Sequence, residues 1–264
     1  MGLLINRKTK AAAMALVLAV LMLTYTPSNA WAALTVKANH DDVKIGYNYH
    51  GSTVSIGGIS DPGVDLILKI SSDNASEKMR RKDKVAGFLW MNVEELHLEN
   101  VPAVYFLRST KDPAQLLDAA KLTANGIGYE AITQNAEISP LPDPNRKNAL
   151  FADFIKYQES KNKFSQSVGG IELTPHPEGQ AYQTLFDWPY QVSPGDYQVT
   201  AYAVKDGDVV DTAQTNVTVE NAGEVKALHD LASNNGALYG IAAIMVAIAA
   251  GFGVGMVFRS GGAH

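Results

Sequence analysis

The sequence predicts a mainly β protein: an immunoglobulin-like antiparallel β-sandwich with a helical insertion, followed by one C-terminal transmembrane helix. Three observations support this fold class. Short apolar or alternating runs, separated by turn residues, lie on both sides of a middle segment with helical spacing. Neither half has enough strands to close a sandwich alone, so one domain fits better than the alternative of two small ones. The last long segment is uncharged and long enough to cross a bilayer.

The N-terminal segment resembles a secretory signal. Three basic residues open it: Arg7, Lys8 and Lys10. They precede an uncharged apolar stretch, 11–23, and residues 30–32 (Ala-Trp-Ala) fit the small-residue cleavage pattern. The apolar stretch is shorter than the ~20 residues of a span, so we expect cleavage after Ala32 or Ala30 rather than an uncleaved anchor. We predict that residues 1–32 are a signal peptide.

The first half of the body is typical of strands. The run 64–70 follows an Asp-Pro-Gly turn and is mostly apolar, as in a largely buried strand. The charged run 73–84 is interpreted as a loop or hairpin tip, and the run 85–93 is apolar and aromatic. The further predicted strands of this half are 34–38, 53–56 and 103–107.

The middle of the chain has helical spacing. Asp112-Pro113 opens a first predicted helix that continues to about Ala124, since proline is favourable at a first helical position. After a proline-rich connector, residues 145–163 predict a second helix with its large apolar side chains mostly on one side. The helical insertion is expected at about 112–165.

The β pattern returns after Gly169-Gly170. Predicted strands are 171–173, 183–188, 197–204 and 209–219. In the third of these, Tyr197 and Val199 alternate with polar residues, and Asp206-Gly207 is a strong hairpin signal. Trp90, Trp188 and Tyr197 are interpreted as core or sandwich-edge aromatics. The sandwich domain is expected to span 33–222.

The C-terminal segment predicts a membrane anchor. Residues 237–258 carry no charge and no proline, and at ~1.5 Å per residue they extend about 33 Å. A buried core helix is the alternative, but the segment has no polar face. The export signal and Arg259 place the domain in the periplasm, the helix in the inner (cytoplasmic) membrane and the tail 259–264 in the cytoplasm. The linker 223–236 has helix-spaced apolar residues.

Small residues form one stripe on this predicted helix. They lie four residues apart: Ala243, Ala247, Gly251 and Gly255. Such stripes let two helix backbones approach closely, so we predict an interface with a membrane-protein partner or in a homodimer. The alternative is that glycine and alanine are simply common in membrane helices.

Composition and motifs exclude several function classes. The net charge of -5 gives no indication of a nucleic-acid partner, and the absence of cysteine excludes disulfides and thiolate chemistry. His40, Asp41, Asp42 and His50 could ligate a metal, but their spacing matches no known motif, so we predict no metal and no cofactor. No nucleophile or phosphate-loop motif is present, so we predict no enzymatic activity. An enzyme with a site assembled from distant residues is the least favoured reading.

A basic cluster precedes Trp90. Arg80, Arg81 and Lys82 are candidate ligands for an anion, because guanidinium groups suit carboxylate, sulfate or phosphate. A solvated hairpin, or an edge protected by charge, is the favoured alternative.

Several stretches in order resemble a family of transmembrane proteins first described from alphaproteobacteria. They are residues 80–82, 87–92, 104–109, 185–186, 194–197, 206–207 and 238–240 leading to 258–259. The resemblance implies a periplasmic domain on a C-terminal anchor and an association with sulfite-exporter-type permeases. It implies no catalytic residue.

The leading hypothesis is therefore a membrane-anchored periplasmic accessory or interaction protein that contacts the bilayer and a membrane partner. A periplasmic sensor or binding module for an anion or small solute is the alternative.

Overall fold

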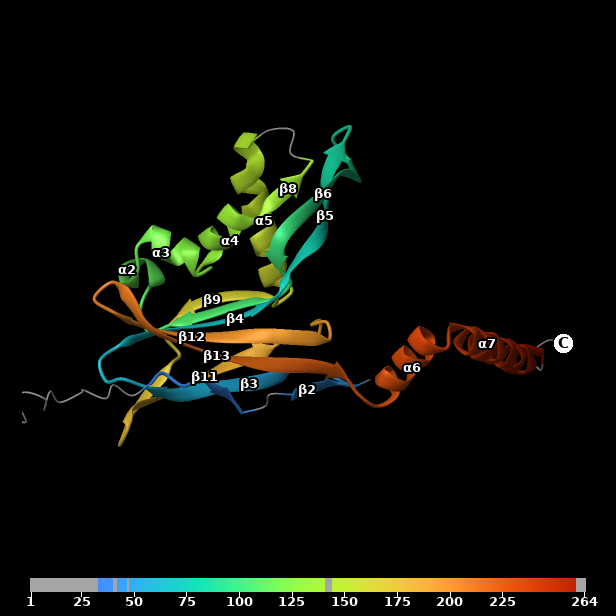
Figure 1. Cartoon of the computed structure of the whole chain (residues 1–264). Coiled ribbons are helices and arrows are strands. Elements are labelled where there is room, and N and C mark those ends of the chain that lie inside the picture. Colours follow the sequence, from blue (N-terminus) through green and yellow to red (C-terminus); the bar gives the residue numbers. More distant parts are fainter. Residues whose placement is uncertain (1–32, 40–41, 47, 141–143, 260–264) are drawn as a thin grey trace, which may run out of the picture. The chain divides into compact units, whose positions relative to one another are not determined.

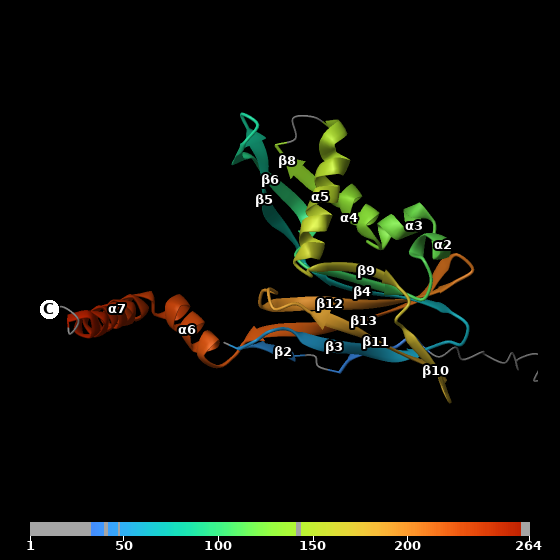
Figure 2. The same cartoon turned by 180° about the vertical axis from the view of Figure 1, so that it is seen from behind.

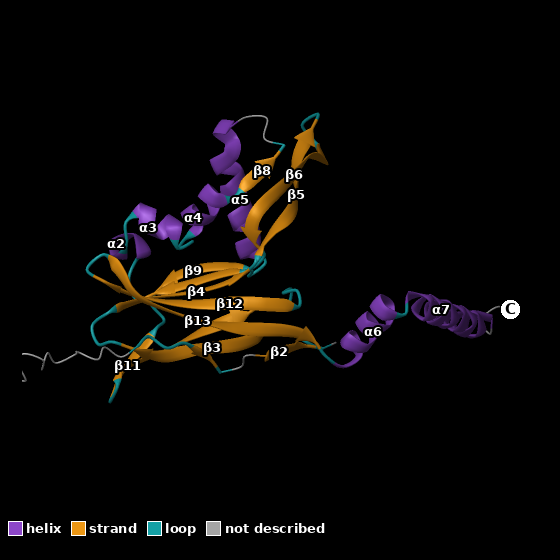
Figure 3. Cartoon of the chain, viewed as in Figure 1, coloured by secondary structure: helices purple, strands orange, loops and turns teal. Residues whose placement is uncertain are grey.

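The computed structural model describes residues 33–39, 42–46, 48–140 and 144–259, and it is mostly β (Figures 1 and 3). The predicted signal segment 1–32 lies outside these residues, as do residues 260–264 of the tail that we predict to be cytoplasmic. The described chain forms three sheets.

The first sheet is antiparallel and has the order β1-β3-β11-β10. Its strands are β1 (Lys37–Ala38), β3 (Ser52–Ser60), β11 (Gly179–Trp188) and β10 (Glu172–His176). The backbone of Thr35 lies so close to Gly58 of β3 that a side chain would not fit there, because a Cβ at Gly58 would lie 1.9 Å from the carbonyl oxygen of Thr35.

The second sheet has the order β2-β13-β12-β4-β7-β9. Its strands are β2 (Asp42–Ile45), β13 (Asp208–Asn221), β12 (Gly195–Lys205), β4 (Asp65–Ser72), β7 (Tyr105–Ser109) and β9 (Phe164–Val168). The central strands pair antiparallel, whereas the edge strands β2 and β9 pair in parallel with β13 and β7. We did not predict β2 or β9, since each is short and depends on a partner far away in sequence.

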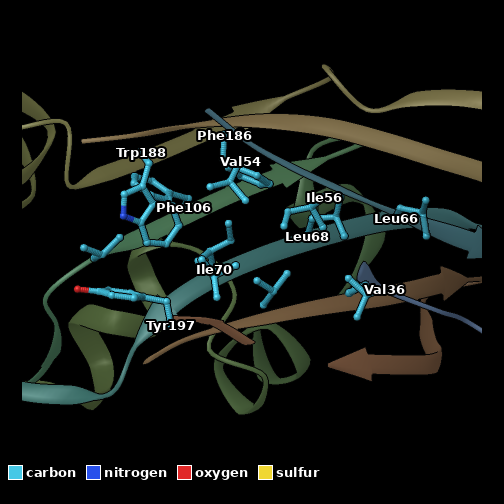
Figure 4. Packing of buried hydrophobic residues seen from close by; sticks show 14 of the residues in the cluster. Val36, Val54, Ile56, Leu66, Leu68, Ile70, Phe106, Phe186, Trp188 and Tyr197 are labelled. Atoms are coloured by element: carbon cyan, nitrogen blue, oxygen red, sulfur yellow. The ribbon is translucent and has the colours of Figure 1, made fainter. Parts of the chain in front are cut away.

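The two sheets enclose one hydrophobic core, which makes them the two layers of a sandwich (Figure 4). Leu68 and Ile70 of β4 meet Val54 and Ile56 of β3 in this core. The ring of Trp188 packs edge-on against Tyr197, with centroids 5.1 Å apart. Both aromatics are buried, as predicted from the sequence.

The outer face of the second sheet is buried as well. Ile67 of β4, Leu107 of β7 and Tyr202 of β12 contribute to a second core, which the helices cover (Figures 1 and 2). The Tyr105 hydroxyl donates to the Gly126 carbonyl (3.1 Å) and accepts from the Gly128 N–H (2.7 Å). These bonds connect the sheet to the helical layer and satisfy a hydroxyl that would be costly to bury alone.

The helical insertion consists of short pieces. They are α2 (Pro113–Leu116), α3 (Ala119–Ala124), α4 (Tyr129–Asn135), a 3-10 turn (Pro144–Arg146) and α5 (Lys147–Ser160). The first predicted helix is split, because Leu117 is extended and the Asp118 side chain accepts from the Lys121 N–H as a new N-cap. In α5, Phe151 and Phe154 are buried in the second core, whereas Tyr157 is exposed.

The third sheet contains a long hairpin. Its strands are β5 (Asn74–Val85), β6 (Leu89–Pro102) and β8 (Glu137–Ser139). The interpretation of 73–84 as a loop or hairpin tip was wrong for most of this run, because β5 is a strand and the turn lies at Ala86–Phe88. Its polar sequence is tolerated because most of β5 faces solvent and its charges pair across the hairpin.

Two helices end the described chain. The predicted linker forms α6 (Gly223–Asn234), and α7 (Gly236–Arg259) contains the predicted span.

Candidate functional site

Helix α7 has an apolar surface that nothing in the described chain covers. The segment Gly236–Met256 is long and apolar enough to cross a membrane, and none of it is buried. Ile244, Val246 and Phe252 are each more than half exposed. A core helix would be mostly buried, so this alternative does not fit. Lipid is the medium that suits such a surface.

The stripe of small residues lies open on this helix. A shallow groove is lined by Ile248, Gly251, Phe252, Gly255 and Met256. A Cβ at Gly251 or Gly255 would meet nothing within 4 Å, so packing within the described chain does not require glycine there. The interface at Ala243, Ala247, Gly251 and Gly255 stays a prediction.

The predicted anion ligands lie on β5, where carboxylates of β6 bind two of them. Arg80 donates to Glu95 at 2.9 Å, and Arg81 donates to Glu94 at 3.1 Å and to Asp83 at 3.0 Å. The hydrogen bond from Arg81 lowers the pKa of Glu94, and that from Arg80 lowers the pKa of Glu95. Both guanidinium groups are therefore engaged by carboxylates.

The three predicted ligands also do not converge. Arg80 and Lys82 are exposed, whereas Arg81 is half-buried and points to the other face of the hairpin. On that face, the Glu94 carboxylate also binds Arg146, with 3.2 Å between its Oε2 and Nη2 of Arg146. Lys82 lies opposite Asn92 and has no ion pair with any residue that the structure describes. The geometry fits the charge-paired hairpin better than a single anion site.

The turn of this hairpin carries exposed apolar side chains, which we call the hairpin tip: Val85, Phe88, Leu89, Trp90, Met91 and Val93. Phe88 is 78% exposed and Trp90 is 62% exposed, so the interpretation of Trp90 as a core or edge aromatic was wrong. The Lys84 ammonium lies 5.4 Å from the centroid of the Trp90 ring. Contiguous apolar surface of this kind marks an interaction site more often than an isolated exposed side chain does.

A cleft that we did not predict lies at one edge of the sandwich. It has a volume of about 710 Å³ and is lined by parts of β3, β7, β9 and β11 and by the end of α5. Its aromatic wall is formed by Phe106, Phe186 and Trp188, and its hydrogen-bonding groups include Thr53, Asn162 and Gln166. This volume is within the usual range of small-molecule sites.

Arg108 is the cation of this cleft. Its guanidinium carbon lies 5.4 Å from the centroid of the Phe186 ring, and it has no ion pair with any residue in the described ranges. A Cβ at Gly170 would lie 2.5 Å from Nη1 of Arg108, so the glycine leaves room for this guanidinium. The carboxylates of Glu159 and Asp187 also line the cleft. The sequence feature that could have indicated this cleft is a single arginine, Arg108, within the apolar strand Tyr105–Ser109.

The metal hypothesis is not supported by the described residues. Among them, no group of three His, Asp or Glu side chains is close enough to hold an ion. His40 and Asp41 lie outside these residues, and His50 Nδ1 lies 2.6 Å from the Asn48 carbonyl oxygen.

The β-rich fold and the exposed apolar helix define a membrane protein, and the described residues contain one candidate transmembrane helix near the C-terminus. A family model described as "Putative transmembrane protein (Alph_Pro_TM)" matches residues 33–260, and the chain belongs to this family. This confirms the resemblance inferred from the sequence. No curated protein sequence matches the chain.

Proposed function

We propose that the protein is a non-enzymatic accessory protein, anchored in the inner membrane by α7, whose periplasmic immunoglobulin-like sandwich and helix interact with a membrane partner. The observation that carries this proposal is the uncovered apolar surface of α7. The exposed hairpin tip is a second apolar surface on the same chain, which fits a body that works next to a membrane.

The small-residue stripe is the proposed contact within the membrane. Lipid tails are as apolar as the helix, so association there depends on close backbone packing, which Gly251 and Gly255 permit. The family resemblance suggests a permease of the sulfite-exporter type as the partner, and a homodimer is the alternative.

We expect Gly251→Leu combined with Gly255→Leu to abolish the helix contact, because two branched side chains would separate the backbones. Cells expressing the full chain are solubilised in mild detergent, and co-purifying membrane proteins are quantified by mass spectrometry. Gly253→Leu is the matched control, since Gly253 lies off the stripe and should retain the partner. Equal recovery of the same proteins with all three chains would contradict the proposal.

A binding module for a small anion or solute is the second candidate function, and the cleft around Arg108 favours it. Arg80 and Arg81 are already bound to carboxylates, so Arg108 is the better ligand for an anion. A guanidinium beside aromatic rings suits a molecule with a carboxylate and an apolar body.

We expect Arg108→Gln to weaken binding of benzoate, a probe with these two features, about tenfold or more, since a hydrogen bond to a charged group contributes about 1.5–3 kcal/mol. The full chain in detergent is titrated calorimetrically. Arg80→Gln removes a guanidinium outside the cleft and should leave the affinity unchanged. Identical affinities for Arg108→Gln and the unchanged protein, or no binding by either, would remove this candidate.

A further inference from the structure

We propose that the hairpin tip inserts into the lipid surface of the membrane that α7 spans, with anionic headgroups around its lysines. The tip would be a second membrane contact, made by the folded body itself. This inference depends only on the anchoring part of the proposed function and not on the identity of a protein partner.

Apolar side chains lie on both faces of the tip. Val85 pairs with Leu89 on one face, Trp90 lies opposite Lys84 on the other, and Phe88 is in the turn between them. A flat protein surface would cover one face of a hairpin and leave the second in water. Lipid surrounds an inserted hairpin on all sides, so it suits a tip that is apolar on both faces.

The length of the apolar region along the hairpin matches the depth to which interfacial segments insert into a membrane. Three cross-strand pairs separate the turn from the polar part of the hairpin, the last of them Asp83–Met91. At ~3.3 Å per residue this is about 10 Å. Apolar faces of interfacial segments are buried about 5–10 Å into the headgroup and acyl boundary.

The charged residues next to the apolar side chains of the tip favour anionic lipid. Asp83 stays ionised, because hydrogen bonds from the Lys84 N–H and then the Arg81 side chain lower the pKa of its carboxyl, and the Arg81 guanidinium, 3.0 Å away, balances its charge. Lys82 and Lys84 have no carboxylate partner within the described part of the chain. Lysine stems can lie along apolar surface while the ammonium groups reach the headgroups.

The side chain of Trp90 has the properties of an interfacial residue. Tryptophan is enriched at the boundary between lipid and water, where its ring and its N–H meet different surroundings. The anchor holds the body close to a membrane, so a contact too weak to recruit a free protein can still form.

Trp90 emission in a reconstituted full chain tests this proposal. The full chain is placed in vesicles of phosphatidylcholine and phosphatidylglycerol, with and without lipids that carry a doxyl quencher near the glycerol. Subtracting the emission of Trp90→Phe isolates Trp90 from the other tryptophans. We expect the doxyl lipid to remove most of the Trp90 emission, and removal of phosphatidylglycerol to reduce this loss.

Two further variants control for orientation and for the role of the tip. Tyr190→Trp in the Trp90→Phe background places a tryptophan at an exposed position of the body, and we expect little quenching there. Phe88→Ser should reduce the quenching of Trp90 without unfolding the body, since Phe88 is exposed.

The proposal is overturned if Trp90 is not quenched, or is quenched no more than the tryptophan at position 190. A blue-shifted but unquenched emission would instead show that the tip is covered by protein, which also overturns it. Alkaline carbonate extraction of the same vesicles reports on the anchor separately, so loss of the anchor is distinguishable from failure of the tip to insert.

Discussion

Replacing Ile244 and Ile248 with arginine is expected to release the protein from the membrane. Both side chains lie near the middle of the predicted span and are more than half exposed, so neither is held by packing within the described chain. Each arginine at a helix centre costs about 2.5–3.5 kcal/mol on insertion scales. Together they remove most of the driving force that an apolar helix of this length provides.

The measurement is the fraction of full chain that resists alkaline carbonate extraction. Ile244→Leu combined with Ile248→Leu changes the same positions without adding charge and should remain in the membrane. If the double arginine variant also resists extraction, α7 is not the anchor, and the proposed function fails with it.

The second large effect is expected from two neighbouring residues of β4. Ile67 and Leu68 are both fully buried, but Leu68 lies in the core between the sheets and Ile67 in the core beneath the helices. Truncation of a buried Leu or Ile to alanine costs about 2–5 kcal/mol, because the cavity closes only partly. We expect Ile67→Ala and Leu68→Ala each to lower the free energy of unfolding by this amount.

Urea unfolding of the full chain in mild detergent, followed by Trp188 fluorescence, measures both effects. Leu185→Ala is the matched control, since this side chain is 53% exposed and its loss should change stability by about 0.5 kcal/mol or less. An effect of Ile67→Ala as small as that of Leu185→Ala would mean that the helices contribute no core to the second sheet.

The strands that carry the sandwich could be recognised in the sequence because their patterns are local. The apolar run 64–70 predicted a largely buried strand, and β4 is buried on both faces, as continuous apolar runs are in covered sheets. In β12 the alternation at Tyr197 and Val199 correctly predicted side chains that face the core between the two sheets. Thr200 and Tyr202 on its other face are also buried, because the helical layer covers them.

The long hairpin could not be recognised in the same way. Its stability depends on pairs such as Arg80 with Glu95 and Arg81 with Glu94, which are more than ten residues apart. A single strand rich in charged residues resembles a solvated loop until its partner strand is placed beside it. Strand pairing therefore places two of the three predicted cations, Arg80 and Arg81, in ion pairs, and Trp90 is exposed at the tip.

The sequence by itself determined the family, the β-rich body and the apolar C-terminal helix, because each depends on contiguous stretches of chain. Only the tertiary structure decided which charges remain unpaired and which apolar residues remain uncovered. Arg108 lies in a cleft and Arg80 in an ion pair, although both are arginines in strands. The physical reason is that burial and ion pairing arise between segments far apart in the chain, and a linear pattern does not contain those distances.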